Sequence, residues 1–568
     1  MSLSGILNLS STALAVNTAA IQTTGNNIAN VGNADYTRQA TNVSSKGDTK
    51  IGPGQYLGNG VNLDGITRQI NEALESRLRG ATSDSESAST REDWLGRVES
   101  VFNELSDSDL STKLSTFFKG WSDLANKPQD ASLRQVVLEN AGTVADWFHQ
   151  IDNGLESLQT DLNNSTKGLA DQADNLSKQI ADLNTRITAA EGGNQGASAN
   201  SLRDQRDGLI KQLSSIMDIT TVPQANGATN IYVNSEPLVM NGQTNGVTTV
   251  QEQDGEHTVL KAVFKSNNGL MKIESGQLGA ITKVGETLRG TSDKVDQLAS
   301  SLTFELNKIH SSGQGLEGFT TAVGTTIVLD STKPLNDPES GIKQPPGNGS
   351  FVIHVKDKAT GLTTSEMIKV DLNGTAGDTT LDSLIAQIDG VDGITAVNNG
   401  GRLQITADNA PAAEITFSQD TSGVLASLGV NSFFQGTNAK DIQVSDAFLK
   451  NPSLIAAAQN GESGDNQTAL AISKLEDTGV TTLTGATLKE SYASMIDSLA
   501  SATSQAKTDV TSTEAVTQML QNQRDTLSGV SMDEEAVNLM RFQRAYQGAA
   551  RLVTVVDELM DTMLNMVR

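Results

Sequence analysis

The sequence predicts an α+β multidomain protein, in which a terminal α-helical coiled coil and a helical bundle carry inserted antiparallel β domains. Three observations support this fold class. Apolar residues at both ends of the chain recur in alternating steps of three and four residues, a spacing typical of coiled-coil helices. A long stretch between them keeps the same spacing. Two further blocks are rich in β-branched residues and in Asn-Gly pairs, which favour hairpins.

The N-terminal segment, residues 3–31, predicts a helix with one apolar and one largely polar row. The polar row includes Ser10, Asn17 and Thr24. Because a seam this polar makes a weak coiled coil by itself, we expect the helix to need a partner. The apolar row and its flanking residues are Leu3, Leu7, Leu14, Ile21, Ile28 and Val31.

The C-terminal segment supplies the candidate partner, and Leu552, Val555 and Leu559 widen its apolar face. An ordinary core-facing helix at each end of a globular fold is the alternative interpretation of these patterns. We expect both segments to be frayed in a free subunit and to become ordered when subunits pack side by side, because isolated helices are marginally stable. The rows of both segments are therefore the candidate assembly interface. The C-terminal row contains Leu539, Phe542, Tyr546, Val553, Val556, Met560, Met563 and Val567.

In the middle of the chain, segments with helical spacing alternate with segments rich in β-branched residues. Helical spacing is expected over 66–125, 133–190, 200–216 and 281–311, and again from about 465 to the end with breaks near 479 and 529. The sequence therefore predicts four nested domains. They are a terminal coiled-coil domain (1–60 plus 512–568), a helical-bundle domain (61–218 plus 276–317 plus 436–511), an inserted β domain (219–275) and an outer β-rich domain (318–435).

Composition excludes several kinds of function. The 568 residues include 41 Lys and Arg against 67 Asp and Glu, so the formal net charge is −26, which disfavours binding to nucleic-acid phosphates. The absence of cysteine removes disulfides, thiolate catalysis and Cys-based zinc sites. The four His are far apart in sequence, and no nucleotide-binding or hydrolase motif stands out. We expect no catalytic residues, no cofactor and no metal.

The N-terminus carries no basic segment followed by a continuous apolar core, the pattern of a secretory signal peptide. No apolar run reaches the ~18–20 residues that are needed to span a bilayer. We therefore expect a cytoplasmic protein, or one that leaves the cell by a route that needs no cleaved signal.

Three stretches of text carry a family resemblance. Residues 26–39 read Asn-Asn-Ile-Ala-Asn-Val-Gly-Asn-Ala-Asp-Tyr-Thr-Arg-Gln, and this resembles the N-terminal signature of bacterial flagellar axial proteins, with Asp35 where that family usually has Gly. Residues 531–539 are similar to the C-terminal text of the same family. Residues 200–209 resemble a segment of its hook-associated branch. The residues taken as family motif are Asn27, Ile28, Ala29, Asn30, Tyr36, Arg38, Gln39, Asp204, Gln205, Arg206 and Asp207.

The resemblance implies a structural protein of the flagellum that polymerises as a ring or helical layer at the junction of hook and filament. Its implied partners are copies of itself, the hook protein, a second junction protein with the filament, and a cytoplasmic export chaperone that binds the C-terminal region. It also implies export through the flagellar type III apparatus without a cleaved signal, and an extracellular location. Nucleic-acid binding and membrane insertion are not expected.

Two other functions remain open from the sequence. One is another tube-forming axial protein, hook-like or flagellin-like, which the number of copies per flagellum would distinguish. The other is a secreted hydrolase or glycan-binding adhesin whose active part is the block 318–435. This block contains no Trp and no Tyr, although sugar-binding sites commonly use exposed aromatic side chains.

Overall fold

In a computed structural model of the chain, the described residues are 3–102, 109–192, 199–255, 257–374, 377–462 and 464–566. Val567, predicted as an interface residue, lies outside them. The chain divides into two compact units. Unit 1 contains Met1–Trp94, Asp161–Gly285 and Ser504–Arg568, and unit 2 contains Leu95–Thr160 and Glu286–Thr503. Four helices have residues in both units: α2 (Glu72–Phe102), α4 (Ala131–Glu191), α6 (Gly276–His310) and α11 (Leu488–Ser528).

The predicted α+β fold class is confirmed, since long helices accompany several small antiparallel sheets. The helices expected over 133–190, 200–216 and 281–311 correspond to α4, α5 (Asn200–Ile216) and α6. The predicted breaks near 479 and 529 separate α10 (Gln467–Lys474), α11 and α12 (Met532–Met566).

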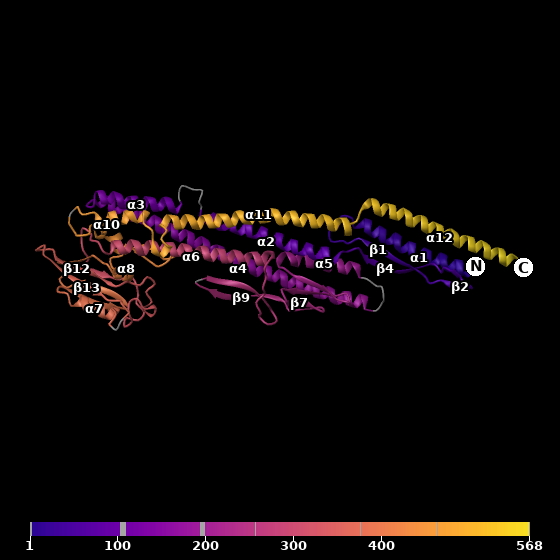
Figure 1. Ribbon diagram of the computed structural model, residues 1–568, viewed down its shortest axis with the longest axis horizontal. Helices are drawn as coiled ribbons and strands as arrows, with labels where there is room; N and C mark the ends of the chain where they lie inside the picture. The colour runs from indigo at the N-terminus through magenta and orange to yellow at the C-terminus, as the bar shows by residue number, and fades with distance from the viewer. Residues whose placement is uncertain are drawn as a thin grey trace. The chain divides into compact units, whose positions relative to one another are not determined.

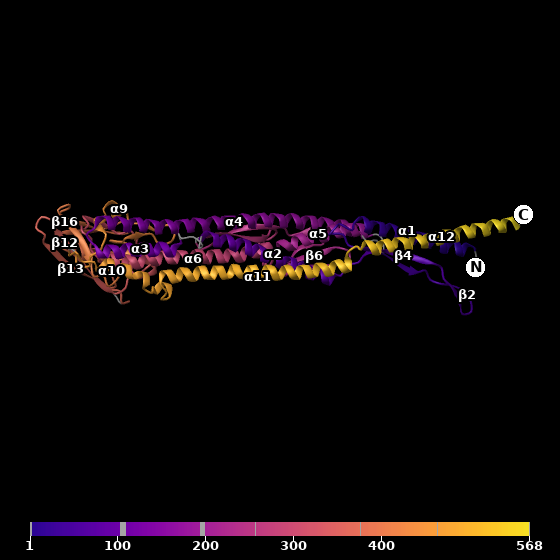
Figure 2. The ribbon, with the colours of Figure 1, turned by 90° about the horizontal axis from the view of Figure 1, so that it is seen from above.

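Unit 1 contains both terminal helices and the first inserted β region. The terminal helices α1 (Leu3–Ala29) and α12 pack against each other and run side by side in both views (Figures 1 and 2). The strands of this unit are β1 (Gln39–Ser45), β2 (Thr49–Gly52), β3 (Gln55–Leu57), β4 (Val61–Arg68), β5 (Thr220–Pro223), β6 (Thr229–Val233), β7 (Glu236–Met240), β8 (Gln243–Thr244), β9 (Val247–Asp254) and β10 (His257–Phe264).

The inserted β region of unit 1 consists of antiparallel hairpins, as its Asn-Gly pairs predicted. Strands β5 to β8 form one sheet in sequence order, and β9 pairs with β10 in a second. Asn241 and Gly242, between β7 and β8, both have positive φ (49° and 82°), which is the backbone of the tight hairpin turn that Asn-Gly favours. Side chains of these sheets and of α4 and α5 share one apolar core, which includes Ala173, Leu213 and Ile231.

A β ribbon over residues 39–68 was not predicted. Strand β1 pairs antiparallel with β4, and β2 pairs with β3 in the hairpin between them. The ribbon strands bury few side chains, so their sequence lacks the alternation of apolar and polar residues that reveals a half-buried strand. The ribbon packs closely on α1 at Gly60. A Cβ atom at this position would lie only 2.6 Å from Oγ1 of Thr12, so the close approach requires glycine.

Unit 2 contains the second inserted β region and a set of short helices. Its helices, besides the parts of long helices assigned to it, are α3 (Leu110–Asn126), α7 (Leu381–Asp389), α8 (Val424–Leu428), α9 (Asp446–Lys450) and α10. The 3₁₀ turns are η1 (Pro338–Ser340), η2 (Pro452–Leu454), η3 (Leu475–Asp477) and η4 (Thr481–Leu483). Its strands are β11 (Thr321–Val323), β12 (Gly349–Asp357), β13 (Thr363–Val370), β14 (Ile394–Asn399), β15 (Arg402–Ala407), β16 (Ala413–Ser418), β17 (Phe434–Gln435) and β18 (Gln443–Val444).

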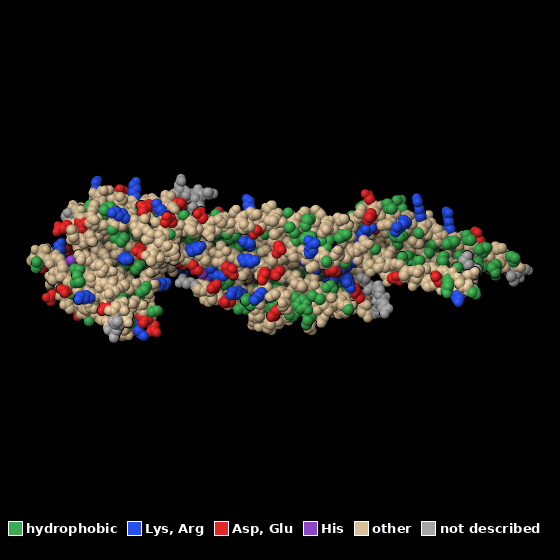
Figure 3. Space-filling model, viewed as in Figure 1, with side chains coloured by type: hydrophobic (Ala, Val, Ile, Leu, Met, Phe, Trp, Pro, Cys, Tyr) green, Lys and Arg blue, Asp and Glu red, His purple; other side chains and the backbone are tan. Residues whose placement is uncertain are grey.

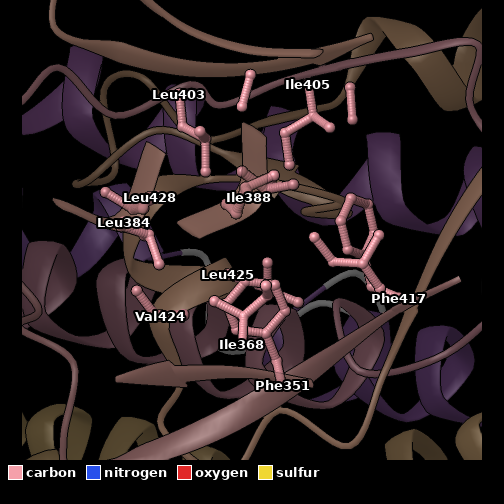
Figure 4. Packing of buried hydrophobic residues seen from close by; sticks show 14 of the residues in the cluster. Phe351, Ile368, Leu384, Ile388, Leu403, Ile405, Phe417, Val424, Leu425 and Leu428 are labelled. Carbon is pink, nitrogen blue, oxygen red and sulfur yellow. The ribbon is translucent and has the colours of Figure 1, made fainter. Parts of the chain in front are cut away.

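Two three-stranded sheets of unit 2 enclose an extensive apolar core. Their strand orders are β13-β12-β16 and β11-β15-β14, and α7 and α8 contribute side chains to the same core. Figure 4 shows Phe351 and Phe417, from neighbouring strands, packed with Ile388 of α7 and Leu425 of α8. This region therefore buries its large side chains within a single chain.

Candidate assembly site

The pair formed by α1 and α12 buries an unusual set of side chains. The buried residues of α1 are Ser10, Ala20, Thr23, Thr24 and Asn27, and those of α12 are Glu535, Ala549 and Val556. The contact therefore uses the polar row of the N-terminal helix and small residues, which allow close approach of the two backbones. Most of the large apolar residues of both helices are left partly or fully accessible.

The predicted interface residues fall into three groups by exposure. Val556 is buried, whereas Leu3, Leu14, Ile21, Ile28, Leu539, Phe542 and Val553 are half-buried. The exposed residues are Leu7 (41%), Val31 (45%), Tyr546 (41%), Met560 (43%) and Met563 (56%). The two predicted rows therefore lie on helices that pack against each other, but most of their side chains stay accessible to solvent.

A second apolar row follows α12. Leu552, Val555 and Leu559 are 43%, 49% and 46% exposed, and Met566 is 81% exposed. These residues continue the steps of three and four along a face beside the row that packs on α1. Figure 3 shows the resulting concentration of hydrophobic side chains on the surface formed by α1 and α12. Exposed apolar patches of this kind are typical of protein interaction surfaces.

The N-terminal and C-terminal motifs meet in a hydrogen-bonded cluster, here called the terminal latch: Asn27, Tyr36, Arg38, Gln39 and Glu535. Asn27 Oδ1 accepts from the Tyr36 hydroxyl (2.8 Å) and the Gln39 amide (3.1 Å). Asn27 Nδ2 donates to the Gln39 carbonyl (2.9 Å) and to Glu535 Oε2 (3.0 Å). One asparagine therefore joins the end of α1, the following loop and the start of α12.

An ion pair completes the terminal latch. Arg38 Nε and Nη2 donate to Glu535 Oε1 at 2.9 and 2.8 Å, and Arg38 Nη1 lies 2.7 Å from Glu534 Oε2. Glu535 is only 2% exposed, so this partner and the amide of Asn27 replace the water that its carboxylate loses. Burial, followed by the charges of Asp204 and Glu535, raises the pKa of Tyr36 to about 12 and keeps its hydroxyl a donor.

A second cluster ties helix α5 to the ribbon. Arg68 Nη1, at the end of β4, donates to Asp204 Oδ1 and Asp207 Oδ2, both at 2.8 Å. Arg206 donates to the Gly227 carbonyl (2.8 Å) and lies beside Asp207. Burial raises the pKa of Asp204, and the hydrogen bond and charge of Arg68 oppose this rise. The motif over 204–207 therefore holds the ribbon that follows the latch.

Some motif residues line a groove, and several of these also make internal hydrogen bonds. This groove has a volume of about 990 Å³ and lies in unit 1 between the loop after α1 and helices α4 and α5. Asn30, Tyr36, Asp204 and Gln205 belong to its lining. Of the remaining motif residues, Ile28 is half-buried and Ala29, the last residue of α1, is exposed.

Sequence reasoning did not single out Glu535 or Arg68, although both are central to these clusters. Glu535 lies within the C-terminal family text, but its role depends on Asn27, which is 508 positions away in sequence. Arg68 has no motif around it and meets Asp204 only through the fold. A buried carboxylate and a buried guanidinium become recognisable only when burial is known.

Titratable groups outside these clusters also have strongly shifted pKa values. His310 in unit 2 has no exposed surface, and burial lowers its pKa to about 4. Its Nδ1 donates to the Asn431 carbonyl (2.8 Å) and its Nε2 accepts from the Ala456 amide (3.0 Å), so both nitrogens serve the fold. Within the described residues there is no group of three or more His, Asp or Glu side chains arranged to hold a metal ion. No helix in that same part of the chain is both long and apolar enough to cross a membrane.

Comparisons with known proteins give matches to two family models, to proteins of similar sequence and to a solved structure. A family model described as flagellar hook-associated protein FlgK helical domain matches residues 95–326, and one described as flagellar basal body rod FlgEFG protein C-terminal matches residues 526–566. Flagellar hook-associated protein 1 of Escherichia coli (strain K12) is 26% identical over 99% of this chain and 100% of its own length. That of Bacillus subtilis (strain 168) is 26% identical over 97% of this chain and 96% of its own length. The structure of the flagellar hook junction protein FlgK from Burkholderia pseudomallei matches with a TM-score of 0.49 and 16% identity, over 79% of this chain and 99% of that one.

Proposed function

We propose that this chain, which belongs to the family of flagellar hook-associated protein 1, is a structural component of the bacterial flagellum that joins hook to filament. The observation that carries this function is the similarity to hook-associated protein 1 over nearly the whole of both chains.

We propose that copies of the chain assemble through the apolar rows of α1 and α12. In support, a single chain leaves Leu7, Leu559 and Met563 between 41% and 56% exposed. Fully burying a large aliphatic side chain contributes about 1.5–3 kcal/mol, so several such residues per contact favour association of copies, for which we propose a ring or helical layer. The polar row of α1 packs on α12, so the exposed apolar residues of both helices are left for contacts with other copies.

The motif residues are assigned supporting roles in this assembly. The terminal latch would fix where α12 begins relative to the end of α1, and the cluster around Arg68 would fix the ribbon. Asn30 and Gln205, which line the groove of unit 1, would contact a neighbouring copy there. The four-domain division, with the β regions 219–275 and 318–435 directed away from the tube, remains part of the proposal.

The partners and the route to the flagellum are inferred from the family. The proposed contacts are with the hook protein, with a second junction protein and the filament, and with further copies. Export would proceed through the flagellar type III apparatus without a cleaved signal. A cytoplasmic chaperone would cover the C-terminal region before export, where Leu564 and Met566 of α12 are 69% and 81% exposed. We propose no catalytic activity.

Electron microscopy of cells that lack the protein tests the function directly. We expect hooks without filaments, and flagellin released into the medium. Filaments of normal number and length in such cells would contradict the proposed junction role.

Two substitutions test the assembly surface. Ile21→Asp and Val553→Asp each place a charge in an apolar row, so we expect unit 2 to stay folded while incorporation into flagella is lost. Gln543→Asp, at an exposed polar position of α12, is the matched control and should incorporate normally. Normal swimming with Ile21→Asp and Val553→Asp combined would exclude these rows as the interface.

Hydrogen exchange on the isolated subunit tests whether assembly orders the termini. We expect amides of 1–35 and 540–568 to exchange within seconds in the free chain and to be protected in the assembled state. Strong protection of both segments in the free chain would show that they are ordered before assembly.

A further inference from the structure

A groove in unit 2 is not used by the proposed assembly. Its volume is about 740 Å³, within the range of sites that bind small molecules or peptide segments. One side is formed by α6, and the other by the segment after β11, the turn after η1 and the end of α8. Residues of the β17–β18 hairpin also belong to its lining.

The lining of this groove includes two buried hydroxyl groups without a hydrogen-bond partner in the described part of the chain. They belong to Thr303 of α6 and Ser427 of α8, which are 7% and 4% exposed. A buried polar group without a partner costs about 1–3 kcal/mol. A bound molecule with its own polar groups would remove this cost at two points.

One rim of the groove is an extended apolar strip. Val323 and Ile327 line the groove and are 44% and 48% exposed. Leu329 continues the strip, is 78% exposed and packs beside Gly341. Because Ala322 and Val328 point inward at 2% and 3% exposure, the strip shows the alternation of an extended segment with its apolar side facing solvent.

The charges at the groove are of the opposite sign to those of the chain as a whole. Lys343 and Arg402 both line the groove and are exposed. The one acidic residue of the lining, Asp441, already accepts the amides of Thr437 and Asn438 through Oδ1, at 2.7 and 2.9 Å. In a chain of net charge −26, a groove with two cations and one engaged carboxylate favours an anionic ligand.

We propose that this groove docks an extended acidic peptide segment of a partner protein. Apolar side chains of the peptide would lie along Val323 and Ile327, and its carboxylates would pair with Lys343 and Arg402. Its backbone would satisfy the hydroxyls of Thr303 and Ser427. The alternating apolar strip favours a peptide over a saccharide, since the lining contains no Trp or Tyr on which a sugar ring could stack.

Selection from a phage-displayed library of random short peptides, on the immobilised full chain, tests this proposal without a known partner. We expect enrichment of sequences in which Asp or Glu stands beside alternating apolar residues. An enriched peptide, labelled for fluorescence anisotropy, should bind less tightly at high salt and about tenfold more weakly to the double variant Lys343→Glu, Arg402→Glu. Lys369→Glu, an exposed charge reversal on β13, is the matched control and should bind normally.

Thr303→Val provides an independent measurement, because it removes the hydroxyl while keeping the side-chain shape. The free variant should melt at a higher temperature than the wild type and bind the selected peptide more weakly. A lower melting temperature would mean that the hydroxyl has an internal partner and would overturn the proposal. So would enrichment of no peptides or of basic peptides, binding that the double variant retains, or competition by an acidic oligosaccharide alone. Self-association abolished by the double variant would assign the groove to a second copy instead.

Discussion

The β core of unit 2 and the terminal pair α1–α12 use apolar residues in opposite ways. In the β core, Phe351, Ile353 and Phe417 are fully buried within one chain (Figure 4). In the terminal pair, the buried residues include Ser10 and Thr24, while large side chains such as Leu559 remain near half exposed. The first region is complete as a monomer. The second exposes the surface that we assign to assembly.

The largest effect on stability should come from a cavity in the β core of unit 2. Phe351→Ala removes a fully buried ring from β12, so we expect the free energy of unfolding of unit 2 to fall by about 3–5 kcal/mol. Urea unfolding followed by tryptophan fluorescence measures it. Val397→Ala, at a position of β14 that is 43% exposed, should change stability by less than about 0.5 kcal/mol. Equal losses for the two variants would show that the core does not carry the stability.

Low pH should reduce the stability of unit 2 through the buried His310. The folded pKa of His310 is about 4 against 6.5 in an unfolded chain, because burial and then the charge of Arg134 disfavour the imidazolium. Its neutral form therefore contributes stability that is complete above about pH 6.5 and is lost as the pH falls towards 4. The difference corresponds to about 3 kcal/mol.

Unfolding of unit 2 by urea at a series of pH values measures this loss. Trp121 is a suitable reporter, since its ring centre lies 6.1 Å from that of His310. His310→Gln should be less stable at pH 7 but should lose less further stability between pH 6.5 and 4. If this variant shows the same acid loss as the wild type, other groups cause it.

The sequence predicted the hairpins of residues 219–275 and the long helix α4 better than the ribbon over 39–68. Asn-Gly turns and the 3/4 spacing of α4 predict structure through local backbone preference and periodic burial, which need no knowledge of the fold. The ribbon over 39–68 gave no such signal, because Ile51 and Tyr56 are 61% and 63% exposed and the strands have no buried face.

The terminal latch was predictable only in part. The family motif singled out Asn27, Tyr36 and Arg38. No local sequence pattern links them to Glu535, because Asn27 and Glu535 are 508 positions apart. The inner face of α1 was also not evident. Its apolar row was assigned to assembly between subunits, but no pattern indicated that Ser10 and Thr24 of the polar row would be buried in the pair with α12.

The terminal latch should contribute less to the free energy of unfolding than the β core does, but it should keep the start of α12 ordered. Glu535→Gln keeps the size of the side chain and removes its charge, so we expect a loss of about 1.5–3 kcal/mol, the range of hydrogen bonds to charged groups. In the assembled state, where we expect the terminal segments to be ordered, the loss should appear as faster hydrogen exchange at the start of α12, with unit 2 unchanged. Glu534→Gln is the control, since that side chain is 61% exposed and surface ion pairs contribute about 0–1 kcal/mol. Equal effects of both variants would remove the distinction between the two glutamates.

The smallest effect on the monomer should have the largest consequence for assembly. Leu559→Ser replaces a side chain that is 46% exposed in the single chain, so its free energy of unfolding should change by less than about 0.5 kcal/mol. In an assembly the same position would be buried, and the polar serine would lose the apolar contact at every copy. Incorporation into flagella, measured against the Gln543→Asp control, should therefore fall sharply although the melting temperature does not. A variant that is as stable as the wild type and still incorporates normally would show that this row of α12 faces water in the flagellum.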